Sequence, residues 1–290
     1  MITGHTRLLA VLGDPVHHSL SPLMHNAALA HAQVDACYVA LPVPADHLGE
    51  VLSALWHTQW LGLNITIPHK QRVMQYVTDL TPAAQAIGAV NTLYRGASGW
   101  CGANTDGLGF VQPLAGWSGE MAVVLGYGGA ARAVVWGLQQ IGCTAIHVFS
   151  RQPQQPVMPP AQLHPWSDLP VYLPHADLVV NTTPLGMTPD VAASPLTPEQ
   201  LQTLPAGAWV YDLIYTPRPT QLLRWAAALG YPTQDGLAML VGQGAAAWEY
   251  WFQRAAPLSV MTASLEQYFQ ESLQPMSASA VAGPTSETQG

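Results

Sequence analysis

The stretch Val123-Val124-Leu125-Gly126-Tyr127-Gly128-Gly129-Ala130-Ala131-Arg132 decides the fold of this chain. It places a glycine-rich turn between an apolar run, typical of a buried strand, and a helix-forming segment. Gly126 permits a tight turn, Gly128 lets the backbone approach a pyrophosphate, and Ala131 takes the third small position, where helix and strand pack closely. The helix N-terminus then offers N–H groups and positive potential to phosphates. Although any strand–helix turn can collect glycines, this position predicts a dinucleotide site at Gly126, Gly128, Gly129, Ala130 and Ala131.

The end of the next expected strand indicates which dinucleotide this site takes. A site that prefers NAD usually carries an Asp or Glu there, which binds the ribose 2′-hydroxyl. This chain has Ser150-Arg151 instead, and no acidic residue occurs between Glu120 and Asp168. A guanidinium is therefore available for a 2′-phosphate, and we expect NADP to bind at Ser150 and Arg151. The alternative is that Arg151 is a solvated loop residue.

The pattern around this stretch alternates between strand and helix. In the first hundred residues it predicts strands at 7–12, 37–41, 61–67 and 89–94, and helices at 22–33 and 45–57. A turn at 96–99 predicts a hairpin with a short return strand. Beyond residue 121, strands are expected at 122–125, 145–149, 178–181 and 209–213, and helices at 129–141 and 219–229. Such alternation is typical of an α/β fold with a parallel sheet covered on both faces, here in two lobes.

The remaining segments are less regular. Residues 152–174 are rich in proline and predict little helix. Two helical stretches are expected at 237–254 and 258–272. The last residues, 274–290, are rich in Ser, Ala, Pro, Gly and Thr, and this composition predicts a disordered tail.

Composition excludes several classes of protein. Only 9% of the 290 residues are charged and the formal net charge is −8, so the chain has no basic stripe for nucleic acid. No apolar stretch suits a signal peptide or a membrane span. The three cysteines are isolated and the eleven histidines are scattered, which fits neither a disulfide framework nor a metal site. We therefore expect a soluble, cytoplasmic protein without a metal, acting on a small molecule.

Lysine occurs once, at Lys70, whereas arginine occurs eight times. Arginine stays protonated near neutral pH, whereas a lysine amine can exchange its proton. Lys70 ends the run Asn64-Ile65-Thr66-Ile67-Pro68-His69-Lys70, which predicts a strand followed by a helix that starts at proline. In the first turn of that helix the macrodipole would disfavour the charged amine, as suits a proton-transfer lysine. The alternative is a single leftover surface lysine.

Several polar residues of the first lobe are expected at strand ends or helix starts. The hydroxyls of Ser19 and Ser21 precede a helix and are suited to holding a carboxylate. Ser21 before Pro22 is equally typical of a helix N-cap. Asn91 falls within an apolar strand, and Asp106 lies where the chain passes between the lobes. Each of these two also has a structural reading, as a satisfied core amide and as an N-cap.

Taken together, these segments resemble the shikimate dehydrogenase family. The resemblance rests on the following segments in order: Gly13-Asp14-Pro15, His18-Ser19-Leu20-Ser21-Pro22, Asn64-Ile65-Thr66-Ile67-Pro68-His69-Lys70, Ala89-Val90-Asn91-Thr92, Asn104-Thr105-Asp106-Gly107, residues 126–131, Tyr211-Asp212-Leu213-Ile214-Tyr215, Asp235-Gly236 and Met239-Leu240-Val241-Gly242-Gln243. It extends over about residues 6–272. The combination is far more specific than any single motif.

The resemblance implies reduction of 3-dehydroshikimate to shikimate by NADPH, in the pathway to aromatic amino acids. It implies that Lys70 and Asp106 form the catalytic pair, with Lys70 donating a proton or polarising the carbonyl and Asp106 orienting the lysine. It further implies that a carboxylate is held by Ser19, Ser21 and Tyr215, and hydroxyls by Asn64, Thr66, Asn91 and Gln243. Leu213 and Gly236 would lie at the cofactor, Gly236 facing the nicotinamide.

The same resemblance implies how the chain divides. Residues 1–103 would form an N-terminal α/β substrate domain to which C-terminal helices at 236–272 return. Residues 104–235 would form a Rossmann-like NADP-binding domain, and residues 273–290 a disordered tail. The sequence leaves open whether the protein is a monomer or a homodimer.

Two departures and two alternatives accompany this interpretation. Family members often have a second arginine after the position of Arg151, where this chain has Gln152 and Gln155. The proline-rich stretch replaces a segment that is usually more helical. One alternative is a bispecific quinate/shikimate dehydrogenase, and the other is a non-catalytic NADP-binding paralogue. The paralogue would have no need for both Lys70 and Asp106.

Overall fold

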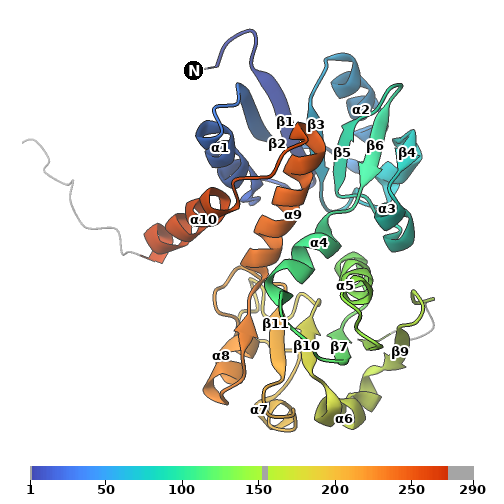
Figure 1. Cartoon of the computed structure of the whole chain (residues 1–290), viewed down its shortest axis with the longest axis vertical. Coiled ribbons are helices and arrows are strands. Elements are labelled where there is room, and N and C mark those ends of the chain that lie inside the picture. Colours follow the sequence, from blue (N-terminus) through green and yellow to red (C-terminus); the bar gives the residue numbers. More distant parts are fainter. Residues whose placement is uncertain (1, 152–155, 274–290) are drawn as a thin grey trace, which may run out of the picture.

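Two six-stranded sheets, one in each of two lobes, form the framework of the molecule (Figure 1). The computed structural model describes residues 2–151 and 156–273. The first sheet has the order β2-β1-β3-β5-β6-β4. Its strands are β1 (Arg7–Gly13), β2 (Ala36–Pro42), β3 (Gly62–Ile65), β4 (Asp79–Leu80), β5 (Thr92–Arg95) and β6 (Trp100–Ala103). Because β5 runs antiparallel to β6, the predicted hairpin is confirmed.

The second sheet is entirely parallel, with the order β12-β11-β10-β7-β8-β9. Its strands are β7 (Met121–Leu125), β8 (Ala145–Ser150), β9 (Gln162–Pro165), β10 (Leu178–Asn181), β11 (Trp209–Asp212) and β12 (Thr233–Gln234). Val124 and Val123 lie in separate core clusters, because successive residues of a strand point to opposite faces. One cluster includes α5 (Gly129–Gln140), and the other includes α6 (Leu169–Tyr172), α7 (Pro198–Leu201) and α8 (Gln221–Ala228). The predicted doubly covered parallel sheet is confirmed.

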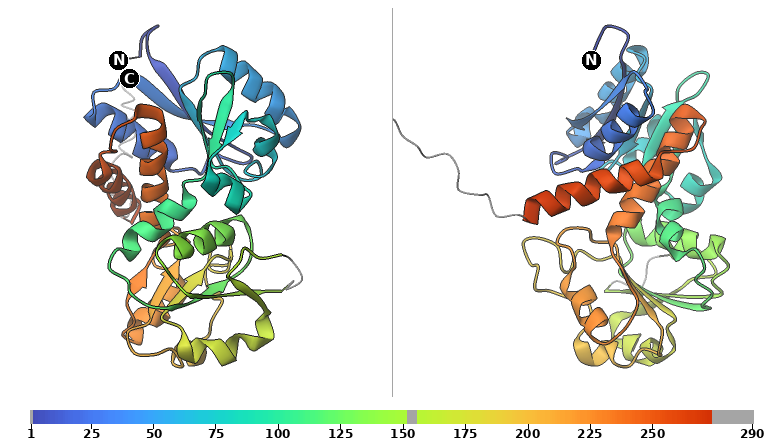
Figure 2. Two further views of the ribbon diagram at one scale, coloured as in Figure 1. Left: turned by 45° about the vertical axis from the view of Figure 1, so that its right-hand side comes forward. Right: turned by 60° about the vertical axis from the view of Figure 1, so that its left-hand side comes forward.

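The last two helices leave the second lobe and join the first. The helices next to the first sheet are α1 (Ser21–His31), α2 (Leu48–His57) and α3 (Pro82–Ile87). From the second lobe, α9 (Gly236–Phe252) rises along α4 (Asp106–Val111) into the first, and α10 (Leu258–Leu273) crosses beside α1 (Figures 1 and 2). Trp248 of α9 and Met261 of α10 are fully buried in one cluster with Leu9 of β1. The return of the terminal helices is therefore as expected.

Arg218 fastens these helices to the second lobe. Its Nε donates to Asp235 Oδ2 at 2.5 Å, and Asp235 also caps α9 by accepting from the Leu237 backbone N–H. The two terminal nitrogens of Arg218 donate to the Glu266 carboxylate of α10 at 3.1 and 3.2 Å. One guanidinium thus joins the loop after β11, the start of α9 and the middle of α10.

The sequence did not predict every element. The segment 71–88 contains β4, α3 and a 3-10 helix. The proline-rich segment, for which little helix was expected, contains β9, the four-residue helix α6 and 3-10 turns on either side of it. The missed strands, which are β4, β9 and β12, are short and lie at sheet edges, so they carry little of the alternation that marks longer strands. The 3-10 helices are Ala45–His47, Arg72–Tyr76, Gln112–Leu114, Trp166–Asp168 and Leu173–His175. The expected tail at 274–290 lies outside the described residues.

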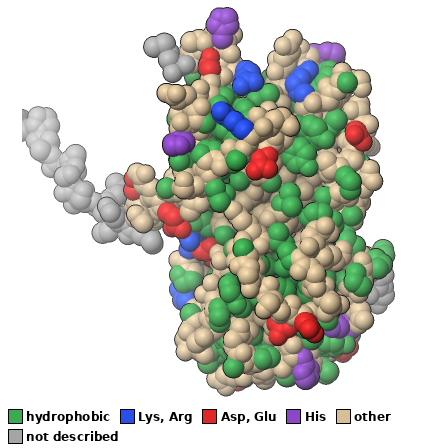
Figure 3. Space-filling model, in the orientation of Figure 1, with side chains coloured by type: hydrophobic (Ala, Val, Ile, Leu, Met, Phe, Trp, Pro, Cys, Tyr) green, Lys and Arg blue, Asp and Glu red, His purple; other side chains and the backbone are tan. Residues whose placement is uncertain are grey.

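Charge is sparse on the molecular surface. On the face in Figure 3, Lys and Arg side chains are separated from one another and interspersed with acidic ones. In the described part of the chain, none of the helices has both the length and the apolarity needed to cross a membrane.

Candidate active site

A pocket of about 340 Å³ brings together all of the residues predicted to act on the substrate. The residues come from the first lobe, from α4 and α9, and from the loop after β11. They are Ser19, Ser21, Asn64, Thr66, Lys70, Asn91, Asp106, Tyr215 and Gln243. Of the predicted cofactor residues, Ala130, Leu213 and Gly236 line the same pocket, whereas Gly126, Gly128, Gly129, Ala131, Ser150 and Arg151 do not.

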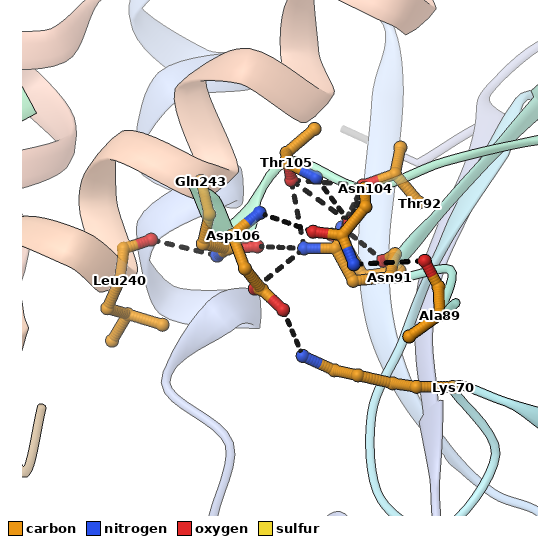
Figure 4. Close-up of polar contacts among 10 residues, drawn as sticks. Lys70, Ala89, Asn91, Thr92, Asn104, Thr105, Asp106, Leu240 and Gln243 are labelled. Carbon is orange, nitrogen blue, oxygen red and sulfur yellow. Dashed lines mark hydrogen bonds and ion pairs between the residues drawn. The ribbon is translucent and has the colours of Figure 1, made fainter. Parts of the chain in front are cut away.

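Lys70 and Asp106 are in direct contact at this pocket (Figure 4). Lys70 Nζ donates to Asp106 Oδ2 at 2.6 Å, and the two side chains are 28% and 11% exposed. The other carboxylate oxygen, Oδ1, accepts from Asn91 Nδ2 at 2.8 Å. The amide therefore fixes the carboxylate, and the carboxylate holds the ammonium at the edge of the pocket, where it can still meet a ligand.

The predicted helix at Lys70 is wrong. Lys70 lies in a turn, and the 3-10 helix that follows begins only at Arg72. The turn stays open because other segments take its carbonyls: Ile67 O accepts from the Asp14 N–H at 3.0 Å, and Lys70 O accepts from the Val90 N–H at 2.8 Å. The macrodipole argument for Lys70 therefore fails, and the charged partner of its amine is Asp106.

Asn91 is both a satisfied amide and a pocket residue. It precedes β5 by one residue and is 2% exposed. Its Oδ1 accepts from the Thr105 N–H at 2.8 Å, and its Nδ2 donates to Thr105 Oγ1 at 2.9 Å (Figure 4). Gln243 Oε1 lies 3.5 Å from the same Nδ2. The two readings of Asn91 are therefore compatible, and Asp106 begins α4 instead of capping it, since Thr105 is the N-cap residue.

Ser21 is the first residue of α1, so its N-cap reading is wrong. Leu20 precedes the helix without a side-chain cap, while Ser19 Oγ accepts from the Ser21 N–H at 3.3 Å. The Ser21 hydroxyl is thus free of a capping role and lies at the pocket wall. Burial raises the pKa of the Tyr215 hydroxyl, which keeps it protonated and able to donate to an anion.

Sequence reasoning missed two residues that hold this site together. Thr105 belongs to the motif Asn104-Thr105-Asp106-Gly107, but only the structure shows that it forms hydrogen bonds with both the oxygen and the nitrogen of the Asn91 amide. Tyr38 of β2 resembled an ordinary core aromatic residue. Its hydroxyl donates to Asn64 Oδ1 at 2.7 Å.

The glycine-rich turn leaves the start of helix α5 open. Gly126 has φ of +97°, and a Cβ there would meet Thr182 and Thr183. At Gly128 and Gly129 a Cβ would meet nothing, so open space lies over the N-terminus of the twelve-residue helix α5. Ala131 is fully buried in the core, as predicted for the third small position.

The other cofactor candidates lie at or just after strand ends of the second sheet. Ser150 ends β8 and Arg151 follows it, exposed, beside the glycine-rich turn of the neighbouring strand β7. Gln152 and Gln155, which stand in place of the second arginine, lie outside the described residues. A side chain at Gly236 would collide with the Leu213 carbonyl, so glycine lets the start of α9 approach the end of β11.

Family comparisons agree with this arrangement. The family model described as the shikimate dehydrogenase substrate binding domain matches residues 11–93. The model described as the shikimate 5′-dehydrogenase C-terminal domain matches residues 236–266. These are the segments that the fold brings together in the first lobe.

Individual relatives match over nearly the whole chain. A shikimate dehydrogenase (NADP(+)) of Thermosynechococcus vestitus is 49% identical and covers 91% of this chain and 96% of its own length. A shikimate 5-dehydrogenase from Thermus thermophilus, solved with NADP(H) and shikimate, is 35% identical with a TM-score of 0.81, covering 90% of this chain and 99% of that chain. A 5-ketofructose reductase of a Gluconobacter species is 30% identical with a TM-score of 0.82, covering 92% and 100%. The chain belongs to the shikimate dehydrogenase family.

Proposed function

We propose that this protein catalyses the NADP-dependent, reversible reduction of 3-dehydroshikimate to shikimate, a step of aromatic amino acid biosynthesis. The observation that carries the proposal is the 2.6 Å contact between Lys70 Nζ and Asp106 Oδ2 in a pocket that also reaches Ala130 at the start of α5. That pocket joins a proton donor to the N-terminus of a phosphate-binding helix. A purely binding paralogue would need neither member of the pair.

The residues divide the work in the following way. In the reduction, the Lys70 ammonium donates a hydrogen bond and then a proton to the ketone oxygen, which becomes a hydroxyl. Asp106 holds the ammonium in place by accepting its hydrogen bond, and is itself held by the Asn91 amide. When bound, NADPH supplies the hydride that completes the new C–H bond. The hydroxyls of Ser19, Ser21 and Tyr215 bind the substrate carboxylate without placing a fixed cation in the pocket.

The arrangement of segments supports a division into two functional domains. In this proposal residues 1–103, with helices at 236–272, bind the substrate, and residues 104–235 bind NADP. Gly126, Gly128 and Gly129 contact the pyrophosphate through their backbone, and Arg151 binds the 2′-phosphate. The three cysteines are free in the described chain, which supports a role in the reducing cytoplasm.

The direct test is oxidation of shikimate by purified protein with NADP⁺, followed by absorbance at the wavelength of the reduced cofactor. Quinate replaces shikimate in one parallel reaction, and NAD⁺ replaces NADP⁺ in another. We expect turnover with shikimate and NADP⁺ that falls strongly with either replacement. Comparable turnover of quinate would make the enzyme bispecific. No turnover with any pair, in folded protein that binds NADPH, would refute the proposed catalysis.

A further inference from the structure

Tyr38 lies directly behind the substrate pocket without lining it. It belongs to β2, is 1% exposed, and its hydroxyl donates to Asn64 Oδ1 at 2.7 Å. Asn64, from β3, does line the pocket. A buried hydroxyl that bonds a pocket amide from behind controls how that amide can face a ligand.

The hydrogen-bond partners determine the positions of the oxygen and the nitrogen of the Asn64 amide. Asn64 Nδ2 lies 3.2 Å from the Asn91 carbonyl oxygen and 3.2 Å from Thr92 Oγ1. Because a carbonyl oxygen can only accept, the NH₂ group must point toward Asn91, and the amide oxygen must point toward Tyr38. Both N–H bonds of Asn64 are then used within the protein. One lone pair of Oδ1 stays available, so Asn64 can offer a ligand an acceptor but no donor.

Tyr38 itself is held rigidly by helix α1. Asn26 Nδ2 donates to the Tyr38 carbonyl at 2.8 Å, and Asn26 Oδ1 accepts from the Tyr38 N–H at 2.9 Å. The His25 ring stacks on the Tyr38 ring with 4.4 Å between centroids and 16° between planes. Burial raises the pKa of the Tyr38 hydroxyl, an effect that a hydrogen bond with Ser21 opposes, and it stays a protonated donor at neutral pH.

We propose that Tyr38 is a positioning residue that fixes Asn64 as a hydrogen-bond acceptor for one ring hydroxyl of the substrate. The inference rests on the proposed function, because shikimate supplies the hydroxyl. Without the Tyr38 hydroxyl, Oδ1 loses the donor that orders it, and the acceptor no longer has a fixed direction. Recognition of one hydroxyl should weaken, while binding of the cofactor should not change.

The test compares Tyr38→Phe with a matched control, Tyr250→Phe. The control tyrosine is partly buried, packs against the same core cluster and stacks on Tyr94 with 4.9 Å between ring centroids. Phenylalanine keeps the ring shape in both variants, and thermal unfolding with and without NADPH checks that each is folded. We expect Tyr38→Phe to lower kcat/KM for shikimate about tenfold. This is the effect expected when one hydrogen bond is lost and the Asn64 amide is no longer held in one orientation. The KM for NADP⁺ should stay unchanged, and Tyr250→Phe should match the wild type.

Substrate analogues that each lack one ring hydroxyl identify the group that Asn64 accepts from. With one of these analogues, the kcat/KM values of the wild type and of Tyr38→Phe should agree within about twofold, because the hydroxyl that donates to Asn64 is absent. Unchanged kcat/KM for shikimate in Tyr38→Phe would overturn the inference. A loss of the same size with every analogue would also overturn it, since Tyr38 would then act through Ser21 or through the fold. A wild type that does not oxidise shikimate would refute the proposed function, and the inference with it.

Discussion

Acidification should destabilise this protein through His25, and substitution of that histidine should remove the effect. His25 is 1% exposed, and neither ring nitrogen has a hydrogen-bond partner among the residues that the structure describes. Burial lowers its pKa from 6.5 to about 3. A charged imidazolium at this place would have no partner, so the folded protein keeps the ring neutral.

The sign and size of the change in stability follow from the pKa values of His25 in the unfolded and folded states. In the unfolded chain His25 takes up a proton below about pH 6.5, whereas in the folded protein it does so only near pH 3. Between these values the unfolded state binds more protons, so stability is lost as the pH falls. From pH 7 to pH 5 the loss is about 2 kcal/mol, at about 1.36 kcal/mol per pH unit. This figure requires only that the folded pKa lie well below 5.

One buried carboxyl acts in the opposite direction. Burial raises the pKa of Asp212 to about 6, although Thr220, Ile214 and Asn181 donate hydrogen bonds to it. Because the folded pKa is the higher one here, protonation of Asp212 restores about 1 kcal/mol between pH 7 and pH 5. The slope of the wild type alone therefore does not isolate His25.

A comparison with His25→Phe does isolate it. Phenylalanine keeps the stack on Tyr38 and has no ring nitrogen to protonate. The quantity to follow is the difference between the two proteins in the free energy of unfolding, at pH 7 and at pH 5. A cost of repacking that does not depend on pH, and the contributions of all other titrating groups, cancel in the change of this difference. Urea unfolding with circular dichroism should give a difference that shifts by about 2 kcal/mol in favour of the variant. His25→Leu is a second variant in case phenylalanine is crowded. A difference that is the same at both pH values would refute the reasoning.

Three further substitutions, the last with Glu266→Gln as its control, test the site and its support. Lys70→Arg should fold normally but lose at least about a hundredfold in kcat, because a fixed cation cannot supply the proton; near-normal turnover would exclude proton transfer by Lys70. Arg151→Ala should raise the KM for NADPH about tenfold with little change for NADH, and equal effects on both cofactors would argue against a 2′-phosphate contact. Arg218→Gln should lower the free energy of unfolding by about 2 kcal/mol in urea titrations, because it leaves the Asp235 carboxylate largely buried without its cation. Glu266→Gln, whose side chain is 43% exposed, should cost less than about 1 kcal/mol, and an equal cost for the two variants would contradict this account.

The sequence predicted most reliably what depends on neighbouring residues. The glycine-rich turn and the strands around it were correct, because Gly126 and Ala131 act within one strand–turn–helix unit. The residues predicted to bind the substrate were chosen because they stand in motifs of a known family. Their convergence on one pocket became visible only in the structure.

Contacts between distant segments account for what the sequence missed. The helix expected at Lys70 does not form because Asp14 and Val90 take the carbonyls that a helix would use. Tyr38 is separated from Asn64 by 26 residues, and no local pattern distinguishes it from any other buried aromatic residue. The Asn91 amide was open to two readings, since its partner Thr105 belongs to another strand end.

The pairing of Asn26 with Tyr38 also bears on how this chain meets other chains. β2 is an edge strand, and the outward N–H and C=O of an edge residue are a template for strand addition by a neighbouring molecule. At Tyr38, in the middle of β2, both groups are already bonded to one asparagine side chain. A strand from a second molecule could pair at Tyr38 only by displacing the Asn26 side chain. The amide thus protects this edge of the sheet against intermolecular β-pairing, and hence against aggregation.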